Sequence, residues 1–156
     1  MSYLSFTTPI GPVALFEAEG ALVALDWGWL PENEETPLLV EARRQVEAYF
    51  DGALTRFDLP LAPHGTAFQR RVWAALAAIP FGATRSYGAL AAELGSHARA
   101  VGGACGRNPL PLLIPCHRVL AAGGGLGGYS GQDGVATKAW LLRHEGLDVA
   151  AVAGID

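Results

Sequence analysis

Residues 86–106 read SYGALAAELGSHARAVGGACG, and this stretch decides the fold of the second half of the chain. Ser86 is a typical N-cap for a short helix that runs through Leu94, and Gly95 is suited to end that helix. Ser96 then caps a second helix, which extends to the end of the stretch. Two short helices joined at a Gly-Ser turn predict a helix-turn-helix.

The second of these helices consists almost entirely of small residues. Its sequence, ARAVGGA at 98–104, offers little to pack with, but its backbone can approach another surface closely. Arg99 is the one charged side chain that projects from it. A small-residue helix pressed against a neighbouring helix would have the same composition, so this pattern alone leaves both interpretations open.

The residues before this stretch predict a small sheet with helices. Three short β-rich runs, at 3–7, 13–18 and 21–27, predict an antiparallel meander. Thr36-Pro37 opens an amphipathic helix that continues to Gly52 and covers the sheet. Thr66 and Gln69 form a capping box for the next helix. The prediction is an α+β fold, with an N-terminal antiparallel sheet and covering helix followed by a mainly α-helical part that contains the helix-turn-helix.

Three further segments follow the helix-turn-helix. Residues 110–120 are apolar, but their prolines forbid a central strand or a long helix and predict a buried, irregular run. Residues 123–131 hold six glycines and suit a loop that closes over a ligand. A final helix is expected from Asp133 to about Glu145.

Length and composition exclude several classes of protein. A chain of 156 residues with 51% hydrophobic and 17% charged residues is compact rather than disordered. No apolar run is long enough to span a membrane and nothing marks the N-terminus for export, so we expect a cytoplasmic location and no membrane partner. Cys105 and Cys116, the only two cysteines, form neither a disulfide scaffold nor a zinc pattern, and no metal or cofactor is expected.

Positive charge is concentrated in the middle of the chain. The overall charge of −4 argues against a nucleic-acid partner, but residues 1–63 hold three basic and ten acidic side chains, whereas residues 64–122 hold six arginines and one glutamate. This asymmetry points to an anionic partner for the middle of the chain. A chance scatter of arginines would look similar, so charge alone does not decide.

The strongest chemical signal is Pro115-Cys116-His117-Arg118. Cationic or basic neighbours lower the pKa of a thiol and favour the nucleophilic thiolate. Adjacent residues in an extended chain point in opposite directions, so we expect the proton to pass from Cys116 to His117 through a water, with a carboxylate orienting the ring. A cysteine protease or acyltransferase would instead bring its histidine from a distant part of the chain. Cys105 is interpreted as a buried structural cysteine.

Six motifs in this order resemble the O6-alkylguanine-DNA alkyltransferase family. They are Ser86-Tyr87-Gly88, ARAVGGA at 98–104, Asn108-Pro109, IPCHRV at 114–119, Gly128-Tyr129-Ser130-Gly131, and KAWLL at 138–142 with Glu145-Gly146. The resemblance covers residues 64–147 almost continuously, and the N-terminal part resembles the family's variable domain in outline. It implies an N-terminal α/β, ribonuclease H-like domain over residues 1–63 and a C-terminal DNA-binding and alkyl-transfer domain over residues 64–156.

The resemblance implies DNA repair by direct damage reversal. In the family, the damaged guanine is rotated out of double-stranded DNA, which is bound through the minor groove, and its O6-alkyl group passes irreversibly to the protein's own cysteine. Each molecule acts once. Extrusion is needed because an alkyl carbon inside the base stack cannot be reached in line. We expect a monomer that uses no cofactor.

The resemblance also implies roles for individual residues. Cys116 is the alkyl acceptor, His117 the water-mediated base, and Glu145 the carboxylate that orients the ring. Arg99 enters the minor groove, and Tyr87 rotates the target nucleotide and hydrogen-bonds the flipped guanine. The other implied positions are Asn108 as a hinge, Gln69 as a phosphate contact, Gly102 and Gly103 on the DNA-facing helix, Val119, Tyr129 and Ser130 in the pocket wall, and Arg118 in support of the active-site loop.

Two departures from relatives stand out. Some relatives hold four zinc ligands in the N-terminal domain, but this chain has no cysteine before position 105, so no zinc is expected. Glycines at 123, 124, 125 and 128 include positions where relatives often carry larger residues. They either widen the cavity for alkyl groups larger than methyl or only loosen the loop.

Three other functions compete with stoichiometric transfer. A lesion binder of the alkyltransferase-like kind typically has tryptophan where this chain has Cys116. A transcriptional regulator triggered by self-alkylation carries an extra metal-binding module. A plain helix-turn-helix repressor needs polar side chains on its reading helix, which here is mainly alanine and glycine.

Overall fold

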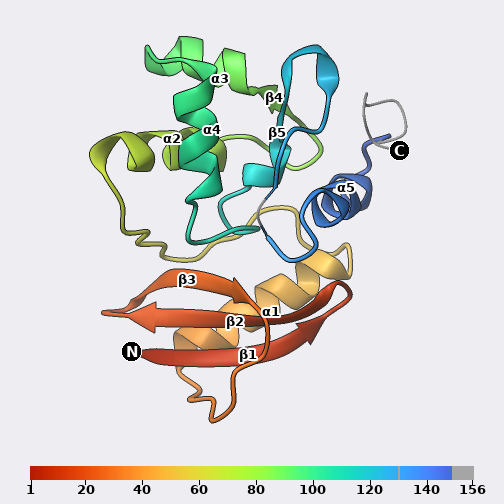
Figure 1. The fold of residues 1–156 in the computed structure, drawn as a ribbon. Helices are drawn as coiled ribbons and strands as arrows, with labels where there is room; N and C mark the ends of the chain where they lie inside the picture. Colours follow the sequence, from red (N-terminus) through yellow and green to blue (C-terminus); the bar gives the residue numbers. More distant parts are fainter. Residues whose placement is uncertain (130, 149–156) are drawn as a thin grey trace. The chain divides into compact units, whose positions relative to one another are not determined.

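The computed structural model describes residues 1–129 and 131–148, drawn in colour in Figure 1. The chain divides into two compact units, Met1–His64 and a second that begins at Gly65. In the described part of the chain, no helix has the length and apolar character that a membrane span requires.

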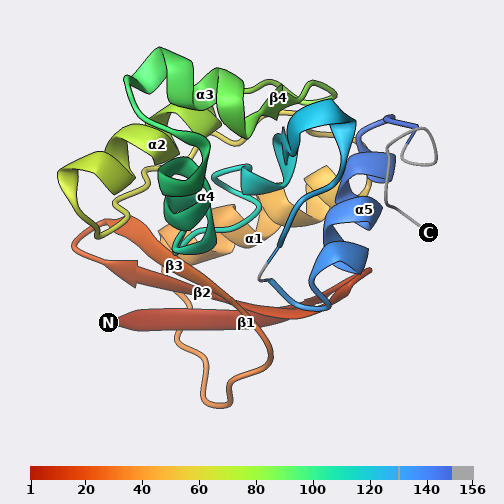
Figure 2. The same cartoon turned by 45° about the horizontal axis from the view of Figure 1, so that its top comes forward.

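The first unit is a three-stranded sheet with one helix against it. Strands β1 (Ser2–Thr8), β2 (Gly11–Ala18) and β3 (Ala21–Trp27) pair antiparallel in that order. Helix α1 (Pro37–Phe50) packs on β1 and β2 through an apolar stripe, and Figure 2 shows it along one face of the sheet. The Thr36 hydroxyl accepts a hydrogen bond from the Leu39 N–H at 3.1 Å, which caps the helix. The predicted meander and covering helix are confirmed.

The second unit begins with three helices. Helix α2 (Ala67–Ala77) has the predicted capping box, α3 is Tyr87–Leu94, and α4 is Ala98–Gly106. Gly95 ends α3 with a φ of 66°, a left-handed conformation that glycine adopts without a steric penalty. The indole N–H of Trp73, a buried residue on α2, donates to the Ala104 carbonyl at 2.9 Å and fixes α4 against α2. The predicted α+β fold is confirmed.

The start of α4 corrects one expectation. The N-cap is His97 rather than Ser96, because the Nδ1 atom of His97 accepts a hydrogen bond from the Ala100 N–H at 3.3 Å. An imidazole nitrogen at this position does what a serine hydroxyl commonly does. The helix therefore starts one residue later than the Gly-Ser turn suggested.

The segment after α4 is more ordered than predicted. Cys116–Arg118 forms the 3-10 turn η1, and β5 (Val119–Leu120) pairs in parallel with β4 (Arg85–Ser86). The sequence predicted an irregular, extended run here. The prolines precede this part of the segment, so nothing prevents the turn or the short pairing.

The rest of the second unit is a second 3-10 turn, η2 (Ala122–Gly124), and the final helix α5 (Val135–His144). Helix α5 begins two residues later than expected. Its N-cap is Gly134, whose φ of 63° sets the entry of the chain.

Candidate active site

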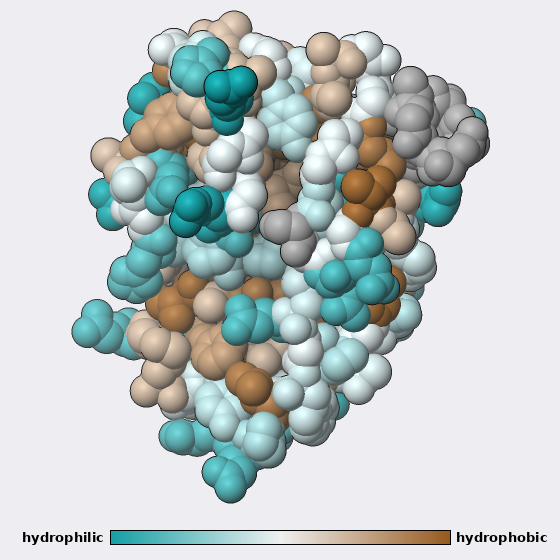
Figure 3. Space-filling model, in the orientation of Figure 1, coloured by the Kyte–Doolittle hydropathy of each residue, from teal (hydrophilic) through white to brown (hydrophobic). Residues whose placement is uncertain are grey.

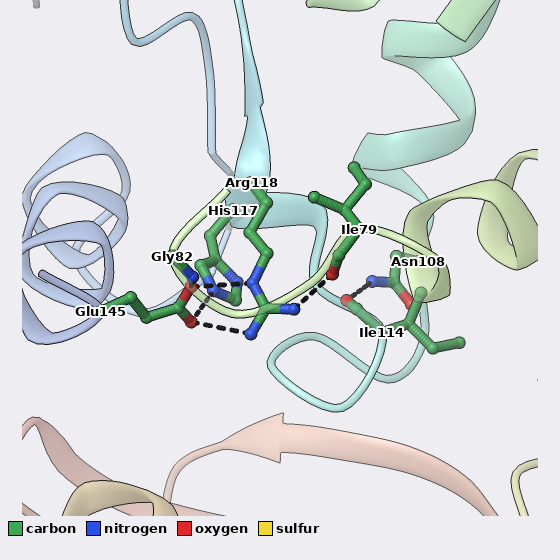
Figure 4. Close-up of polar contacts among 7 residues, drawn as sticks. All are labelled: Ile79, Gly82, Asn108, Ile114, His117, Arg118 and Glu145. Atoms are coloured by element: carbon green, nitrogen blue, oxygen red, sulfur yellow. Dashed lines mark hydrogen bonds and ion pairs between the residues drawn. The ribbon is translucent and has the colours of Figure 1, made fainter. Parts of the chain in front are cut away.

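The turn that carries Cys116 is fixed from within the chain. The side-chain amide of Asn108 donates to the Ile114 carbonyl at 2.8 Å (Figure 4), and its oxygen accepts from the Leu110 N–H at 2.9 Å. Within the turn, the Arg118 N–H donates to the Pro115 carbonyl at 3.0 Å. Asn108 therefore braces the segment leading from α4 to the thiol, which is the place where a hinge would act.

Glu145, at the end of α5, lies in a buried cluster with His117 and Arg118. One carboxylate oxygen, Oε2, lies 2.7 Å from His117 Nε2 and 3.0 Å from an Arg118 terminal nitrogen, and Oε1 accepts from Arg118 Nε at 2.8 Å. The other terminal nitrogen of Arg118 donates to the Ile79 carbonyl at 2.6 Å. Figure 4 shows the carboxylate between the two side chains. The guanidinium balances the carboxylate and holds it in place.

The geometry leaves His117 with one nitrogen able to accept a proton. The side chain is fully buried, and this burial lowers the pKa of His117 although Glu145 opposes the shift. Because Nε2 faces a carboxylate, Nε2 carries the hydrogen. The other nitrogen, Nδ1, is buried and has no hydrogen-bond partner among the residues that the structure describes. A neutral imidazole with a free Nδ1 lone pair is a competent base.

The sequence predicted a lowered pKa for the Cys116 thiol, and this prediction is wrong for the protein before it reacts. Burial raises the pKa of the thiol, against the opposing effects of the Asn108 side chain and the Lys138 charge. Arg118 does not lower it, because its guanidinium is committed to Glu145 and Ile79. The reason is structural: side chains in a 3-10 turn leave in different directions, and sequence neighbours need not be neighbours in space. Cys116 rests as a thiol and needs a base.

Cys116 lies at the wall of a cavity of about 710 Å³ in the second unit. On the face in Figure 3 the surface of this unit is hollowed, with pale and light-brown walls. The lining residues are Tyr87, Gly88, Ala98, Arg99, Gly102, Cys105, Gly106, Cys116, Ala121, Ala122, Gly128 and Tyr129. The lining is mostly apolar with a few polar groups, as is typical of a site for a small organic ligand.

Two tyrosines face this cavity. Burial, with the nearby Cys105 and Cys116, raises the pKa of Tyr87 to about 12, so its hydroxyl keeps its proton and can donate a hydrogen bond. Burial also raises the pKa of Tyr129, whose hydroxyl is buried without a hydrogen-bond partner among the described residues. A ligand with a suitable polar atom would satisfy it.

The remaining predicted residues divide into two groups. Arg99 is exposed on α4, and a Cβ on Gly102 would lie 4.0 Å from the Tyr87 ring. Gly103 and Gln69 lie outside the cavity lining; a Cβ on Gly103 would meet nothing within 4 Å, and the Gln69 side-chain oxygen accepts from the Thr66 N–H in the capping box. The predicted pocket residue Ser130 lies outside the described residues.

Comparison with known proteins shows which family has this arrangement. The model of the "6-O-methylguanine DNA methyltransferase, DNA binding domain" matches residues 67–147, and that of the "6-O-methylguanine DNA methyltransferase, ribonuclease-like domain" matches residues 1–63. The chain belongs to this family. The predicted resemblance is confirmed.

Individual methyltransferases resemble the chain over nearly its whole length. The methylated-DNA–protein-cysteine methyltransferase of Methanosarcina acetivorans is 45% identical over 94% of this chain and 99% of its own, and the constitutive enzyme of Bacillus subtilis is 42% identical over 92% and 94%. Among solved structures, that of Mycobacterium tuberculosis OGT in complex with DNA has a TM-score of 0.83 and 42% identity, covering 92% of this chain and 91% of that one.

Sequence reasoning missed part of this methyltransferase site. Cys105, interpreted as a structural cysteine, is indeed buried but also lines the cavity. Lys138 is fully buried, and its ammonium group donates to the carbonyl of Val119, a residue that the resemblance places in the pocket wall. One sequence signal pointed to Lys138: it is the single lysine in a chain whose other cationic side chains are arginines.

Proposed function

We propose that this chain repairs O6-alkylguanine in double-stranded DNA and transfers the alkyl group to Cys116, once per molecule. Family membership makes the chain a DNA-repair methyltransferase of the direct-reversal kind. The observation that carries the assignment to Cys116 is its position at the cavity wall, followed directly by a buried imidazole whose far nitrogen contacts Glu145 at 2.7 Å.

The proposed reaction starts from the thiol. His117 Nδ1 takes the thiol proton through a water, and Glu145 stabilises the imidazolium that forms. The Cys116 sulfur then attacks the alkyl carbon in line, so that a C–S bond forms while the C–O6 bond breaks and its electron pair moves to O6. The Tyr87 hydroxyl hydrogen-bonds the departing guanine. In the net reaction the thiol proton ends on guanine, and the thioether that remains has no route back to a thiol.

The proposed DNA contacts lie on α4. Arg99 is exposed at the cavity rim, and the open surface at Gly103 lets the helix backbone approach a duplex closely. The excess of arginines over residues 64–122 suits a phosphate backbone. The solved relative from Mycobacterium tuberculosis was crystallised with DNA. Minor-groove binding, the two domain roles, a monomeric state and a cytoplasmic location stay predictions.

Mass spectrometry tests the proposal directly. The protein is mixed with a duplex that contains one O6-methylguanine, and both the intact protein and its peptides are weighed. One methyl group on the peptide that bears Cys116, with repair stopping at one equivalent, is expected. Cys116→Ala should abolish transfer and keep duplex binding, whereas Cys105→Ala, the matched thiol control, should keep both.

The other outcomes would give the chain a different function or a different acceptor residue. Tight binding with no added mass would make it a lesion binder. Repair beyond one equivalent would refute the thiol mechanism, and methylation of Cys105 in the wild-type protein would move the acceptor to the second thiol of the cavity.

A further inference from the structure

A tight turn that follows α2 closes over the buried ion pair of the candidate active site. Its backbone meets both charges. The Ile79 carbonyl accepts from the Arg118 guanidinium at 2.6 Å, and the Gly82 N–H donates to Glu145 Oε1 at 3.4 Å (Figure 4). One short segment therefore supplies an acceptor to the cation and a donor to the anion.

Gly82 allows this turn to approach the last helix closely. Its φ of 80° lies in the region that favours glycine, and a Cβ here would lie 3.4 Å from the Glu145 carbonyl oxygen. The Ala83 N–H donates to the Pro80 carbonyl at 3.1 Å and closes the turn, and β4, which follows, pairs with β5 directly after η1. Backbone hydrogen bonds thus fix the turn, so a change of the Phe81 side chain should leave it in place.

The Phe81 side chain of this turn lies over the ion pair. The Arg118 guanidinium carbon is 6.0 Å from the centroid of the half-buried Phe81 ring, at the outer limit of a cation–π contact. The same ring meets His144 edge to face, with centroids 6.5 Å apart, and His144 stacks on Trp140 at 5.2 Å. Because the attraction to the cation is weak at this distance, the ring acts chiefly as apolar cover for Arg118, which is 6% exposed.

On the basis of the function proposed above, we propose that Phe81 is a positioning residue for alkyl transfer, whose ring keeps water off the Arg118–Glu145 ion pair and thereby keeps the carboxylate on His117. Water that reached the pair would compete with His117 for the carboxylate oxygens. It would also weaken the ion pair, because charges interact more strongly where water is excluded. Among the described residues, Phe81 lies outside the cavity lining, so it acts through Glu145.

The protonation of His117 reports on this cover. The charged groups on the elements packed around its ring are Glu145 and Lys138 from α5, Arg118 from η1, and the exposed Arg70 and Arg71 from α2. Burial has the largest effect and lowers the pKa of His117. Removing the Phe81 ring admits water and weakens this effect, so the pKa of His117 should rise toward its ordinary value of 6.5.

An NMR titration follows this imidazole in the intact protein, with ¹⁵N in the histidines and His117→Gln to identify the signal. In the wild type, His117 should stay neutral below pH 6.5, and the hydrogen on Nε2 should exchange slowly with solvent. In Phe81→Ala the ring should take up a proton near pH 6.5, and the exchange should be faster. Phe81→Leu should restore the wild-type behaviour, because an apolar side chain excludes water without a π face. The same titration of His117 in wild type and Phe81→Ala would overturn the proposal.

The pH dependence of transfer gives a second readout. A base with a pKa of 6.5 is about one-quarter neutral at pH 6 and about nine-tenths neutral at pH 7.5, so single-turnover transfer from free O6-methylguanine by Phe81→Ala should fall about fourfold between these pH values, relative to the wild type. Phe57→Ala is the matched control. Its ring is also half-buried, but it packs on Tyr49 in the first unit, with centroids 5.5 Å apart. Equal pH profiles for the two alanine variants would contradict the proposed role.

These readouts separate the role of Phe81 from the proposed function and from folding. If the wild type transfers no alkyl group, the proposed function fails, but the NMR titration still decides whether Phe81 shields the ion pair. If Phe81→Ala does not fold, Phe81→Val, which keeps part of the apolar cover, takes its place with the same expected direction of change. A His117 ring in Phe81→Val that titrates as in the wild type would then overturn the proposal.

Discussion

Replacing Glu145 by glutamine changes one buried carboxylate to an amide and tests whether proton removal by His117 depends on that carboxylate. The substitution keeps the shape of the side chain and removes the negative charge that Arg118 and His117 share. The Arg118 side chain, 8% exposed, would keep the Ile79 carbonyl as its remaining acceptor in the cluster. The amide keeps one accepting oxygen, which cannot serve both Arg118 and His117, and its NH2 group cannot accept the hydrogen on His117 Nε2.

The expected cost follows from this burial. Removing one partner of a buried ion pair destabilises a protein by about 3–5 kcal/mol, because the other charge is left uncompensated. This is a large part of the 5–15 kcal/mol, roughly, by which a typical domain is stable. General-base catalysis contributes about 10²- to 10⁴-fold to a rate, and part of this is lost when His117, the base, no longer has a carboxylate that orients its ring and stabilises the imidazolium. Glu145→Gln should therefore lower both stability and transfer rate.

A second substitution separates these two effects. In Arg118→Met with Glu145→Gln both charges are absent, so the double variant should recover much of the lost stability but none of the lost rate. Urea unfolding followed by tryptophan fluorescence measures the stability, and single-turnover transfer measures the rate. Glu41→Gln is the control, because Glu41 pairs with Arg44 at the surface, where such pairs contribute little.

Two results would refute the reasoning. A double variant as unstable as Glu145→Gln alone would mean that the cost does not arise from an unpaired Arg118. Transfer by Glu145→Gln at the wild-type rate would mean that His117 does not depend on the carboxylate.

Three further predictions concern DNA contact and pH. Arg99→Ala should impair transfer from a duplex but not from free O6-methylguanine, which needs no flipping; equal loss on both would exclude the finger role. Gly103→Leu should fold normally, since nothing lies within 4 Å of its Cβ position, and should weaken duplex binding in a titration. Burial lowers the pKa of His117 below its ordinary value of 6.5. As the pH falls through 6.5, this imidazole therefore takes up a proton in the unfolded chain but not in the folded protein. Stability should thus fall with falling pH, by up to about 1.4 kcal/mol per unit, and His117→Gln should remove this slope in urea unfolding at pH 5 and 7.

Local chemistry explains why much of the fold could be predicted. The caps at Thr36, Thr66 and Ser86 each bond a backbone group three residues away, and Gly95 ends its helix by its own conformation. Such signals lie within one turn of the chain. The prediction of Ser96 as a cap was wrong, because the backbone at the start of α4 lets the His97 side chain accept from the Ala100 N–H instead.

The candidate site was predicted less completely. The motif around Cys116 was visible because its residues are adjacent. The pairing of His117 with Glu145, 28 residues away, came from a family resemblance rather than from spacing. No pattern showed that Arg118 pairs with Glu145 rather than with the thiol, or that Lys138 is buried against the Val119 and Gly128 carbonyls, because both depend on segments that meet only after folding.

The sequence by itself determined the order of helices and strands, the small-residue helix that bears Arg99, the thiol motif and the family. Tertiary structure decided the protonation states, since the pKa of a group depends on every charge and on the solvent excluded around it, whatever its place in the chain. The thiol of Cys116, the neutral ring of His117 and the buried ammonium of Lys138 all follow from burial and long-range contact.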